Sequence, residues 1–206
     1  MTRSTQTTVR TMRALGLAAG LVLAAGSARA APASMPTGDV TSAPIGHYEL
    51  CLKAPAECST LTSRSAPVKL TRNLWKELVR INNAVNISIQ PRTDMEMWGK
   101  PELWSYPTSE GDCEDYVLLK RHMLMEEGIP AGALLITVVR QPNGDGHAVL
   151  TVRTDRGDFI LDNLEGRILE WDATDYEYLK RQSIRNSGTW VQINDKRTSF
   201  VGSVNR

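Results

Sequence analysis

The sequence has little net charge, no internal repeat and no linker-like segment. Its 206 residues include 24 basic and 23 acidic side chains, which give a formal net charge of +1. A chain without a basic surplus gives no electrostatic reason to expect nucleic acid or an anionic membrane surface as its main partner. Because no Gly/Ser-rich or charged linker divides it, we expect one domain that is large enough to bury a core.

The apolar run near the N-terminus is too short to cross a membrane. Residues 14–25 (ALGLAAGLVLAA) form a run of twelve, whereas a spanning helix needs about 20. Three arginines precede the run, and Ala28-Arg29-Ala30 follows it as a small-x-small cleavage site. We therefore expect residues 1–30 to be a secretory signal peptide, with an uncleaved anchor as the alternative. Cleavage after Ala30 would leave a periplasmic protein without stable membrane insertion.

The sequence has only three cysteines, of which two lie close together and one is separate. Cys51 and Cys58 lie seven positions apart with a proline between them, and Cys113 stands alone. Disulfides persist in an oxidising compartment, so we predict a Cys51–Cys58 bridge, with two reduced cysteines as the alternative. An odd cysteine in an exported protein is either an intermolecular link or a free reactive thiol. Cys113 is thus a candidate nucleophile.

The patterns along the chain predict helices first and a sheet afterwards. Residues 31–45 are rich in Pro, Ala, Ser and Thr and are expected to be a flexible leader before a domain at 46–206. Apolar residues in a 4-3-4 spacing predict a helix from an N-cap at Thr71 to about Asn86. A second helix is predicted from Asp112 to Gly128. Strands are predicted at 133–140, 147–154, 159–164, 189–193 and 200–204, which indicates an α+β domain with an antiparallel sheet.

The stretch EGDCEDYVLLK places Cys113 among carboxyl groups at the start of the second helix. Negative neighbours raise a thiol pKa and favour the unreactive protonated form. The unpaired N–H groups of a first helical turn act in the opposite direction. Either Cys113 is a packing residue, or something nearby reverses the local electrostatics.

Histidine is as scarce as cysteine, and elimination leaves one candidate base for Cys113. His47 lies in an expected irregular region, and His122 is about 13 Å along the same predicted helix. His147 opens a strand directly after a turn. Asp162 shares its face if a four-residue hairpin loop, 154–157, pairs Arg153 with Asp158, since Asp162 then lies diagonally across from His147. A base and an orienting acid are what a thiol nucleophile needs, although sequence order alone does not establish a triad.

Three acids surround Cys113, namely Asp112, Glu114 and Asp115. One interpretation is an acidic first turn that complements the helix dipole. The other is a site for a hard cation such as Ca²⁺, which takes carboxylate and carbonyl oxygens. A bound cation would offset the repulsion and favour the thiolate of Cys113.

Two stretches resemble the bacterial transglutaminase-like cysteine peptidases, whose best-known branch is the periplasmic LapG-type proteases. The first is WGKPELWSYPTSEGDCEDYVLLKRHMLMEEGIP and the second is GHAVLTVRTDRGDFILDNL, within a similarity that spans residues 70–195. The resemblance implies a papain/transglutaminase-like fold with a nucleophile-bearing helix packed on an antiparallel sheet. It also implies Cys113 as nucleophile, His147 as base and Asp162 as orienting residue. Calcium ligands are implied at Asp112, Glu114 and Asp115, with Asp94 as a further acidic ligand.

The resemblance extends to substrate and regulation. LapG-type proteases cut large surface adhesins, and an inner-membrane cyclic-di-GMP receptor sequesters them when the biofilm state is favoured. The expected function is therefore a periplasmic, calcium-assisted cysteine endopeptidase that acts on an exported or surface protein. Alternatives are transglutaminase-type acyl transfer, a non-catalytic peptide- or receptor-binding module, and a calcium-dependent structural protein.

Overall fold

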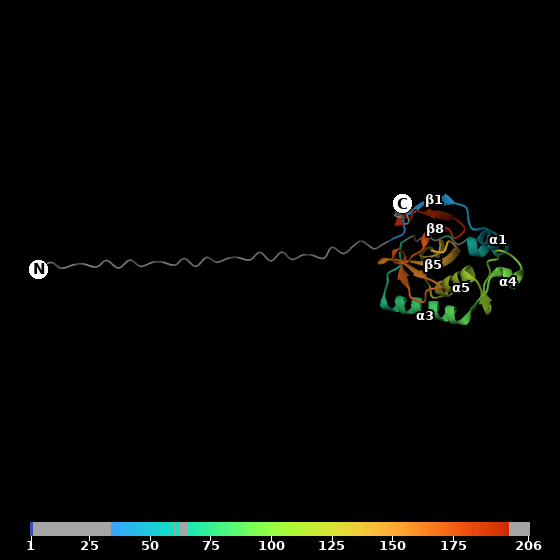
Figure 1. Cartoon of the computed structure of the whole chain (residues 1–206), viewed down its shortest axis with the longest axis horizontal. Coiled ribbons are helices and arrows are strands. Elements are labelled where there is room, and N and C mark those ends of the chain that lie inside the picture. Colours follow the sequence, from blue (N-terminus) through green and yellow to red (C-terminus); the bar gives the residue numbers. More distant parts are fainter. Residues whose placement is uncertain (2–33, 60, 62–65, 198–206) are drawn as a thin grey trace, which may run out of the picture. The chain divides into compact units, whose positions relative to one another are not determined.

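The computed structural model describes residue 1 and residues 34–197, apart from 60 and 62–65 (Figure 1). The signal peptide predicted at 1–30 and the strand predicted at 200–204 lie outside the described residues. Among the described helices, none has both the length and the apolar character to cross a membrane.

A seven-stranded sheet, in which every neighbouring pair of strands is antiparallel, forms the centre of the domain. In spatial order its strands are β1 (Thr37–Thr41), β9 (Trp190–Ile193), β8 (Glu177–Gln182), β4 (Leu134–Arg140), β5 (Gly146–Thr154), β6 (Gly157–Leu161) and β7 (Leu169–Glu170). The strands predicted at 133–140, 147–154, 159–164 and 189–193 correspond to β4, β5, β6 and β9.

The helices lie mainly in the first half of the chain, as the patterns predict. They are α1 (Ile45–Lys53), α2 (Pro55–Cys58), α3 (Arg72–Ser88), α4 (Asp94–Trp98) and α5 (Cys113–Glu126), with short 3₁₀ turns at Ala131–Ala133 and Trp171–Ala173. Thr71 caps α3, because its hydroxyl accepts a 3.1 Å bond from the Leu74 N–H. The mixed helical and antiparallel architecture confirms the α+β prediction.

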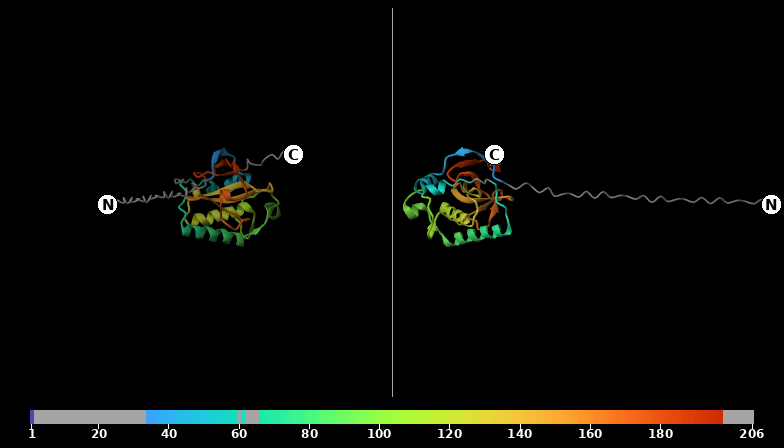
Figure 2. Two further views of the ribbon diagram at one scale, coloured as in Figure 1. Left: turned by 60° about the vertical axis from the view of Figure 1, so that its left-hand side comes forward. Right: turned by 180° about the vertical axis from the view of Figure 1, so that it is seen from behind.

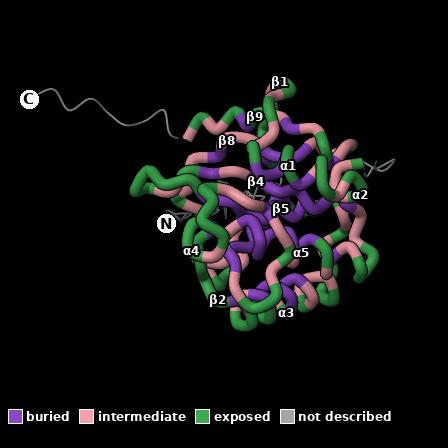
Figure 3. The backbone as a smooth tube through the Cα atoms, turned by 90° about the vertical axis from the view of Figure 1, so that its right-hand side faces the viewer, coloured by how far each residue is buried: buried purple, intermediate pink, exposed green. Residues whose placement is uncertain are grey.

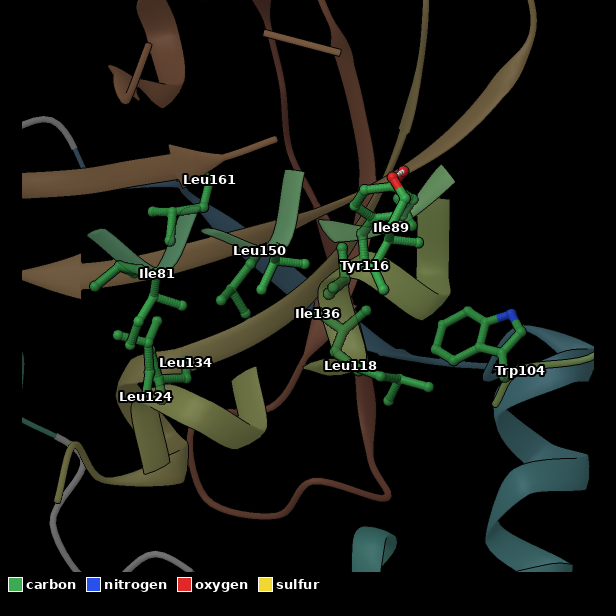
Figure 4. Close-up of a cluster of buried hydrophobic side chains, with 14 of the residues drawn as sticks. Ile81, Ile89, Trp104, Tyr116, Leu118, Leu124, Leu134, Ile136, Leu150 and Leu161 are labelled. Carbon is green, nitrogen blue, oxygen red and sulfur yellow. Dashed lines mark hydrogen bonds between the residues drawn. The ribbon is translucent and has the colours of Figure 1, made fainter. Parts of the chain in front are cut away.

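Helices α5 and α3 form two layers on one side of the sheet. α5 packs on β4 and β5, and α3 packs on α5, as Figures 1 and 2 show. The core lies between the helices and the sheet, and its buried side chains include Ile81, Tyr116, Leu134, Leu150 and Leu161 (Figure 4). The tube coloured by burial shows α5 and β5 as largely buried elements (Figure 3). The helix that begins at Cys113 therefore packs on the sheet, as the resemblance implied.

The hairpin between β5 and β6 has the predicted register with a shorter turn. Arg153 pairs with Asp158 as expected, but the ladder continues to Thr154 and Gly157. The turn therefore has two residues, Asp155-Arg156, in place of the expected four-residue loop. Gly157 supports the tight turn with a φ of 123°, a conformation that glycine adopts without a steric cost. This register, extended by one pair, sets Asp162 opposite Val149 and diagonal to His147.

The prediction of a flexible leader is wrong for residues 37–45. Thr37–Thr41 form β1, which pairs with β9, and α1 already begins at Ile45. The Met35 side chain is buried in a second apolar cluster, and the Met35 N–H donates a 3.0 Å bond to Asp158 Oδ2. Pairing with a strand that follows about 150 residues later is a tertiary interaction, which local composition does not reveal.

Candidate active site

Cys113 is the first residue of α5, and its thiol lies against the start of β5. The backbone N–H of Ala148, the residue after His147, donates to the Cys113 sulfur. The thiol also donates a 3.1 Å bond to Glu114 Oε2. The fold thus brings the predicted nucleophile to the strand that carries the predicted base.

His147 and Asp162 form a buried pair on β5 and just after β6. His147 Nε2 lies 2.8 Å from Asp162 Oδ1, and both side chains are at most 3% exposed. With Nε2 engaged by the carboxylate, Nδ1 is the ring nitrogen that remains for a thiol proton. The structure therefore places the second and third predicted residues in direct contact.

Further bonds fix the orientation of Asp162. The Tyr176 hydroxyl donates a 2.6 Å bond to Oδ2, and the Leu164 N–H donates a 2.9 Å bond to Oδ1. Burial raises the pKa of Asp162, but the hydrogen bonds from His147 and Tyr176 outweigh this effect, so the pKa lies below its usual value. Asp162 is therefore a carboxylate that accepts three hydrogen bonds.

Two residues that contact Asp162 were not predicted from the sequence. Tyr176 bonds to Asp162 and also packs against the His147 ring, with centroids 5.6 Å apart. Asn86 on α3 donates a 2.8 Å bond from Nδ2 to the backbone oxygen of Asp162. Neither residue belongs to a recognisable motif, because each acts through a contact between distant segments.

Three of the predicted calcium ligands lie together beside Cys113. Oxygens of Asp94, Asp112 and Glu114 lie within 4.8 Å of one another. The parallel pairing of β2 (Gln90–Pro91) with β3 (Glu110–Gly111) joins the segment before α4 to the segment before α5. This pairing brings Asp94 to Asp112, whose Oδ2 accepts a 3.3 Å bond from the Asp94 N–H.

Asp115 lies beside this group of acids without being one of the three. Its Oδ1 accepts a 2.8 Å bond from the Ser105 N–H, whereas its Oδ2 is buried without a hydrogen-bond partner among the described atoms. A Cβ atom at Gly111 would lie 2.9 Å from both Asp115 Cβ and Oδ2. Glycine at position 111 is therefore needed for the close approach of Asp115 to the chain before α5.

Burial and mutual repulsion disfavour negative charge in this acidic cluster. Burial, together with the charge of Asp112, raises the pKa of Glu114 to about 9. Burial, with the charges of Asp112 and Asp94, raises the pKa of Asp115 to about 7. Burial also raises the pKa of the Cys113 thiol, and Glu114 raises it further. Burial and the neighbouring acids thus favour the protonated thiol of Cys113 over the thiolate.

The cluster has the chemistry of a hard-cation site. One carboxylate oxygen of each of Asp94, Asp112 and Asp115 is buried without a hydrogen-bond partner in the described part of the chain. Buried polar oxygens normally have a hydrogen-bond partner, and buried oxygens without one are typical of a site that takes an ion. Several carboxylate oxygens that converge within ligand distance suit Ca²⁺, which prefers an all-oxygen shell. The residues present therefore fit the ion that the resemblance implies.

The predicted disulfide is present and borders an aromatic cluster. Cys51 and Cys58 are bonded, with their Cα atoms 5.5 Å apart. The buried His47 ring contacts both sulfurs and stacks edge-on against Trp104 and Trp190. Burial, with a smaller effect from Arg121, lowers the pKa of His47 to about 4, so this imidazole is neutral. His47 is a packing residue, in agreement with its elimination as the base.

An open pocket of about 350 Å³ adjoins the Asp162 side of the pair. Its walls are mixed, because they combine the apolar side chains of Pro142, Ile160, Leu164 and Leu169 with the charged side chains of Glu165, Arg167 and Asp175. Tyr176 also lines the pocket and contacts the His147 ring.

The fold and this arrangement define a transglutaminase-like cysteine peptidase. The family model described as bacterial transglutaminase-like cysteine proteinase matches residues 37–198, and the chain belongs to this family. No curated protein matches the chain.

Two similar solved structures are forms of LapG from Legionella pneumophila. The calcium-bound form is 25% identical and has a TM-score of 0.50, with 57% of this chain and 68% of that chain covered. The EGTA-treated form is 26% identical and has a TM-score of 0.49, with 61% of this chain and 73% of that chain covered.

Proposed function

We propose that this peptidase is a periplasmic, calcium-assisted endopeptidase whose catalytic residues are Cys113, His147 and Asp162. The observation that carries the proposal is the buried 2.8 Å contact of His147 with Asp162, next to the Ala148 N–H that meets the Cys113 sulfur. A thiol nucleophile needs a base beside it and an acid that orients this base, and these contacts support that assignment. The N-terminal location of Cys113 on α5 adds unpaired helix N–H groups.

The chemistry follows from these positions. His147 takes the thiol proton, and the Cys113 sulfur attacks a peptide carbonyl to form a tetrahedral adduct. Backbone N–H groups at the start of α5, that of Cys113 included, stabilise the oxyanion. His147 then gives its proton to the leaving amine, which yields an acyl-enzyme. A water molecule, deprotonated by His147, hydrolyses the thioester and restores the thiol.

Calcium is proposed to act through Asp94, Asp112 and Glu114, with Asp115 beside them. Support comes from the unpartnered carboxylate oxygens among the described residues and from the calcium-bound state of the similar Legionella protein. When bound, the ion supplies positive charge next to the nucleophile. The four acids would hold it, and their own charges would then no longer oppose the thiolate form of Cys113.

The proposed substrate is an exported or surface protein, and a large adhesin linked to biofilm control is the candidate that the family resemblance supplies. An inner-membrane cyclic-di-GMP receptor is the corresponding regulatory partner. The peptidase class supports a protein substrate, and the similarity to LapG supports this branch.

Profiling of protein N-termini tests the proposal and at the same time identifies the substrate. Envelope proteins from a strain that lacks the gene are incubated with the purified wild-type protein or with the Cys113→Ala variant, in calcium or in EGTA. We expect new N-termini only with wild-type protein in calcium. Equal cleavage by Cys113→Ala would contradict the assignment of the nucleophile.

The same incubations separate the alternatives. An added fluorescent amine would be incorporated into glutamine side chains if the thioester is used for transglutamination. Binding to an envelope protein that Cys113→Ala retains, without new N-termini in any condition, would favour a binding module or a calcium-dependent structural protein.

A further inference from the structure

The pocket beside Asp162 has walls to which the proposed reaction gives no role. Its volume is about 350 Å³, and it lies between the turn after β4, strands β6 and β7 and the segment before β8. Tyr176 lines it and also meets the His147 ring, with centroids 5.6 Å apart. The pocket and the proposed base thus share a neighbour. A substrate that reaches the base therefore comes close to the pocket.

Part of the pocket wall is apolar. Ile160 on β6 and Leu169 on β7 are backbone partners in the antiparallel ladder, and both line the pocket. Leu164, after β6, is 59% exposed, and Pro142 comes from the turn after β4. A ligand with a methylene chain would remove this apolar surface from water, which is favourable.

The charged part of the wall is acidic on balance. Three acids and one arginine line the pocket. Glu165 and Arg167 neutralise each other through a 2.7 Å ion pair, and Asp162 accepts three hydrogen bonds. Asp175 is exposed and has no ion-pair or hydrogen-bond partner among the described residues. The pocket therefore offers one acid whose charge a ligand can complement.

We propose that this pocket is a substrate subsite that takes a lysine or arginine side chain of the cleaved protein. Its methylene stem lies along the apolar wall at Leu164 and Leu169, and its cationic head reaches Asp175. Long basic side chains bury their stems on apolar surface and keep the charged head in water, which matches a pocket with both kinds of wall. The inference rests on the peptidase function proposed above and adds a feature of its substrate.

The position of the pocket limits which substrate residue can occupy it. The wall at Tyr176 lies 5.6 Å from the His147 ring, and an extended peptide advances about 3.3 Å per residue. We therefore expect the basic residue within about four positions of the scissile bond, always at the same position.

The cut sites found by N-terminal profiling test the proposal. With wild-type protein, we expect lysine and arginine to be enriched at one position near the cut. Asp175→Asn should weaken this enrichment, and Asp175→Lys should shift it toward acidic residues, because the charge that the pocket complements is reversed. Cut sites without a basic preference, or with an equal preference in Asp175→Asn, would overturn the proposal.

A pair of synthetic peptides isolates the charge. Both contain one profiled cut site, with lysine in one and norleucine in the other at the enriched position, so that only the ammonium group differs. We expect kcat/KM to be about 2–5-fold higher for the lysine peptide, mainly through KM, as for an exposed ion pair. Asp175→Asn should abolish the difference, and equal constants in the wild type would overturn the proposal.

Asp172 offers a matched control. It is an exposed acid three residues before Asp175, and it does not line the pocket. Asp172→Asn makes the same change of charge and should keep the preference for the lysine peptide. An equal loss of preference in Asp172→Asn would mean that general surface charge attracts the peptide, which would contradict a specific role for Asp175.

Binding without turnover distinguishes failure of the subsite from failure of the peptidase function. The probes are acetyl-lysine amide and acetyl-norleucine amide, and methyl NMR of Ile160, Leu164 and Leu169 in Cys113→Ala reports occupancy. We expect larger shifts with the lysine probe, reduced by Asp175→Asn. Selection of this probe without cleavage of any envelope protein would overturn the proposed function. Cleavage without selection would overturn the subsite.

Discussion

At the scale of single residues, the molecule places a thiol where its immediate neighbours oppose ionisation. Glu114 Oε2 accepts a 3.1 Å hydrogen bond from the Cys113 thiol, and burial together with this neighbour raises the pKa of the thiol. In the proposed mechanism Asp162 orients His147, whereas the acids beside the thiol act against transfer of its proton. We therefore expect the reactivity of Cys113 to depend on how the charge of Asp112 and Glu114 is balanced.

Loss of the orienting acid should affect turnover more than substrate binding. Asp162→Asn keeps the shape but weakens the hold on His147, so we expect kcat to fall by about 10²–10⁴-fold with KM little changed. Cleavage kinetics on a substrate found by N-terminal profiling measure both constants. Glu165→Gln, in the same turn, is the control and should retain near-normal kcat. A kcat for Asp162→Asn within a factor of about two of wild type would contradict its role.

Gly111 should be intolerant of even one methyl group. Gly111→Ala would place Cβ 2.9 Å from Asp115, so we expect a loss of about 1–3 kcal/mol in the free energy of unfolding. Gly146→Ala is the matched control, because nothing lies within 4 Å of its added Cβ atom among the described residues. Urea denaturation compares the two variants. Equal stability of both would contradict the close approach of Asp115.

At the scale of elements, the sequence predicts those that have a strong local pattern. The apolar stripe and the Thr71 cap predict α3, and the start of α5 and the register of β5 with β6 are also correct. Strand β8 was missed, because its buried Arg181 and Gln182 resemble surface residues in sequence. Arg181 is paired with Asp158 at 3.0 Å, and Gln182 accepts a bond from the Ile136 N–H. These partners lie on β6 and β4, so the local sequence of β8 does not reveal that its polar side chains are buried.

The same limit applies to the site. Cys113, His147 and Asp162 were predicted because they carry the rare chemistry of the chain and fall in recognisable motifs. Tyr176 and Asn86 were not, because a loop tyrosine and a helical asparagine are ordinary surface residues in sequence. Their hydrogen bonds to Asp162 are tertiary contacts, made from the segment before β8 and from α3.

The disulfide between α1 and α2 should contribute stability rather than chemistry. Replacement of both Cys51 and Cys58 by serine is expected to reduce the free energy of unfolding by about 2–3 kcal/mol. The reason is that the unfolded chain regains the conformational entropy that the closed loop removes. Denaturation measures this loss, and Cys113→Ser is the control, with a change expected below about 0.5 kcal/mol. Cleavage should persist in the double variant at temperatures where it is folded. Loss of cleavage in a folded double variant would assign the bridge a role in the site.

At the scale of the whole molecule, the acidic cluster should make stability depend on pH and calcium together. The folded-state pKa values of Glu114, about 9, and Asp115, about 7, lie above the usual values near 4. The folded chain therefore binds more protons than the unfolded chain between about pH 4 and 9, and the stability from these groups falls as pH rises through this window.

Calcium should replace those protons. We expect it to raise the Tm more at about pH 8 than at about pH 5, because at the lower pH it must displace protons from the carboxyl groups. Differential scanning calorimetry of calcium-depleted and calcium-loaded protein measures the effect, with an Asp94→Asn, Asp112→Asn double variant as the control that should lose it. An equal rise in Tm at both pH values would contradict the link between protons and the ion.

The central claim is that Cys113 is a nucleophile activated by His147 and by a cation on the neighbouring acids. The most direct measurement is the rate of iodoacetamide labelling of Cys113 across pH, in calcium and in chelator, for the wild type and for His147→Ala. We expect labelling in calcium with an apparent pKa well below the free-thiol value of about 8.5, and we expect this low pKa to be lost in chelator and in His147→Ala. Slow labelling with an ordinary or raised pKa in every condition would contradict it.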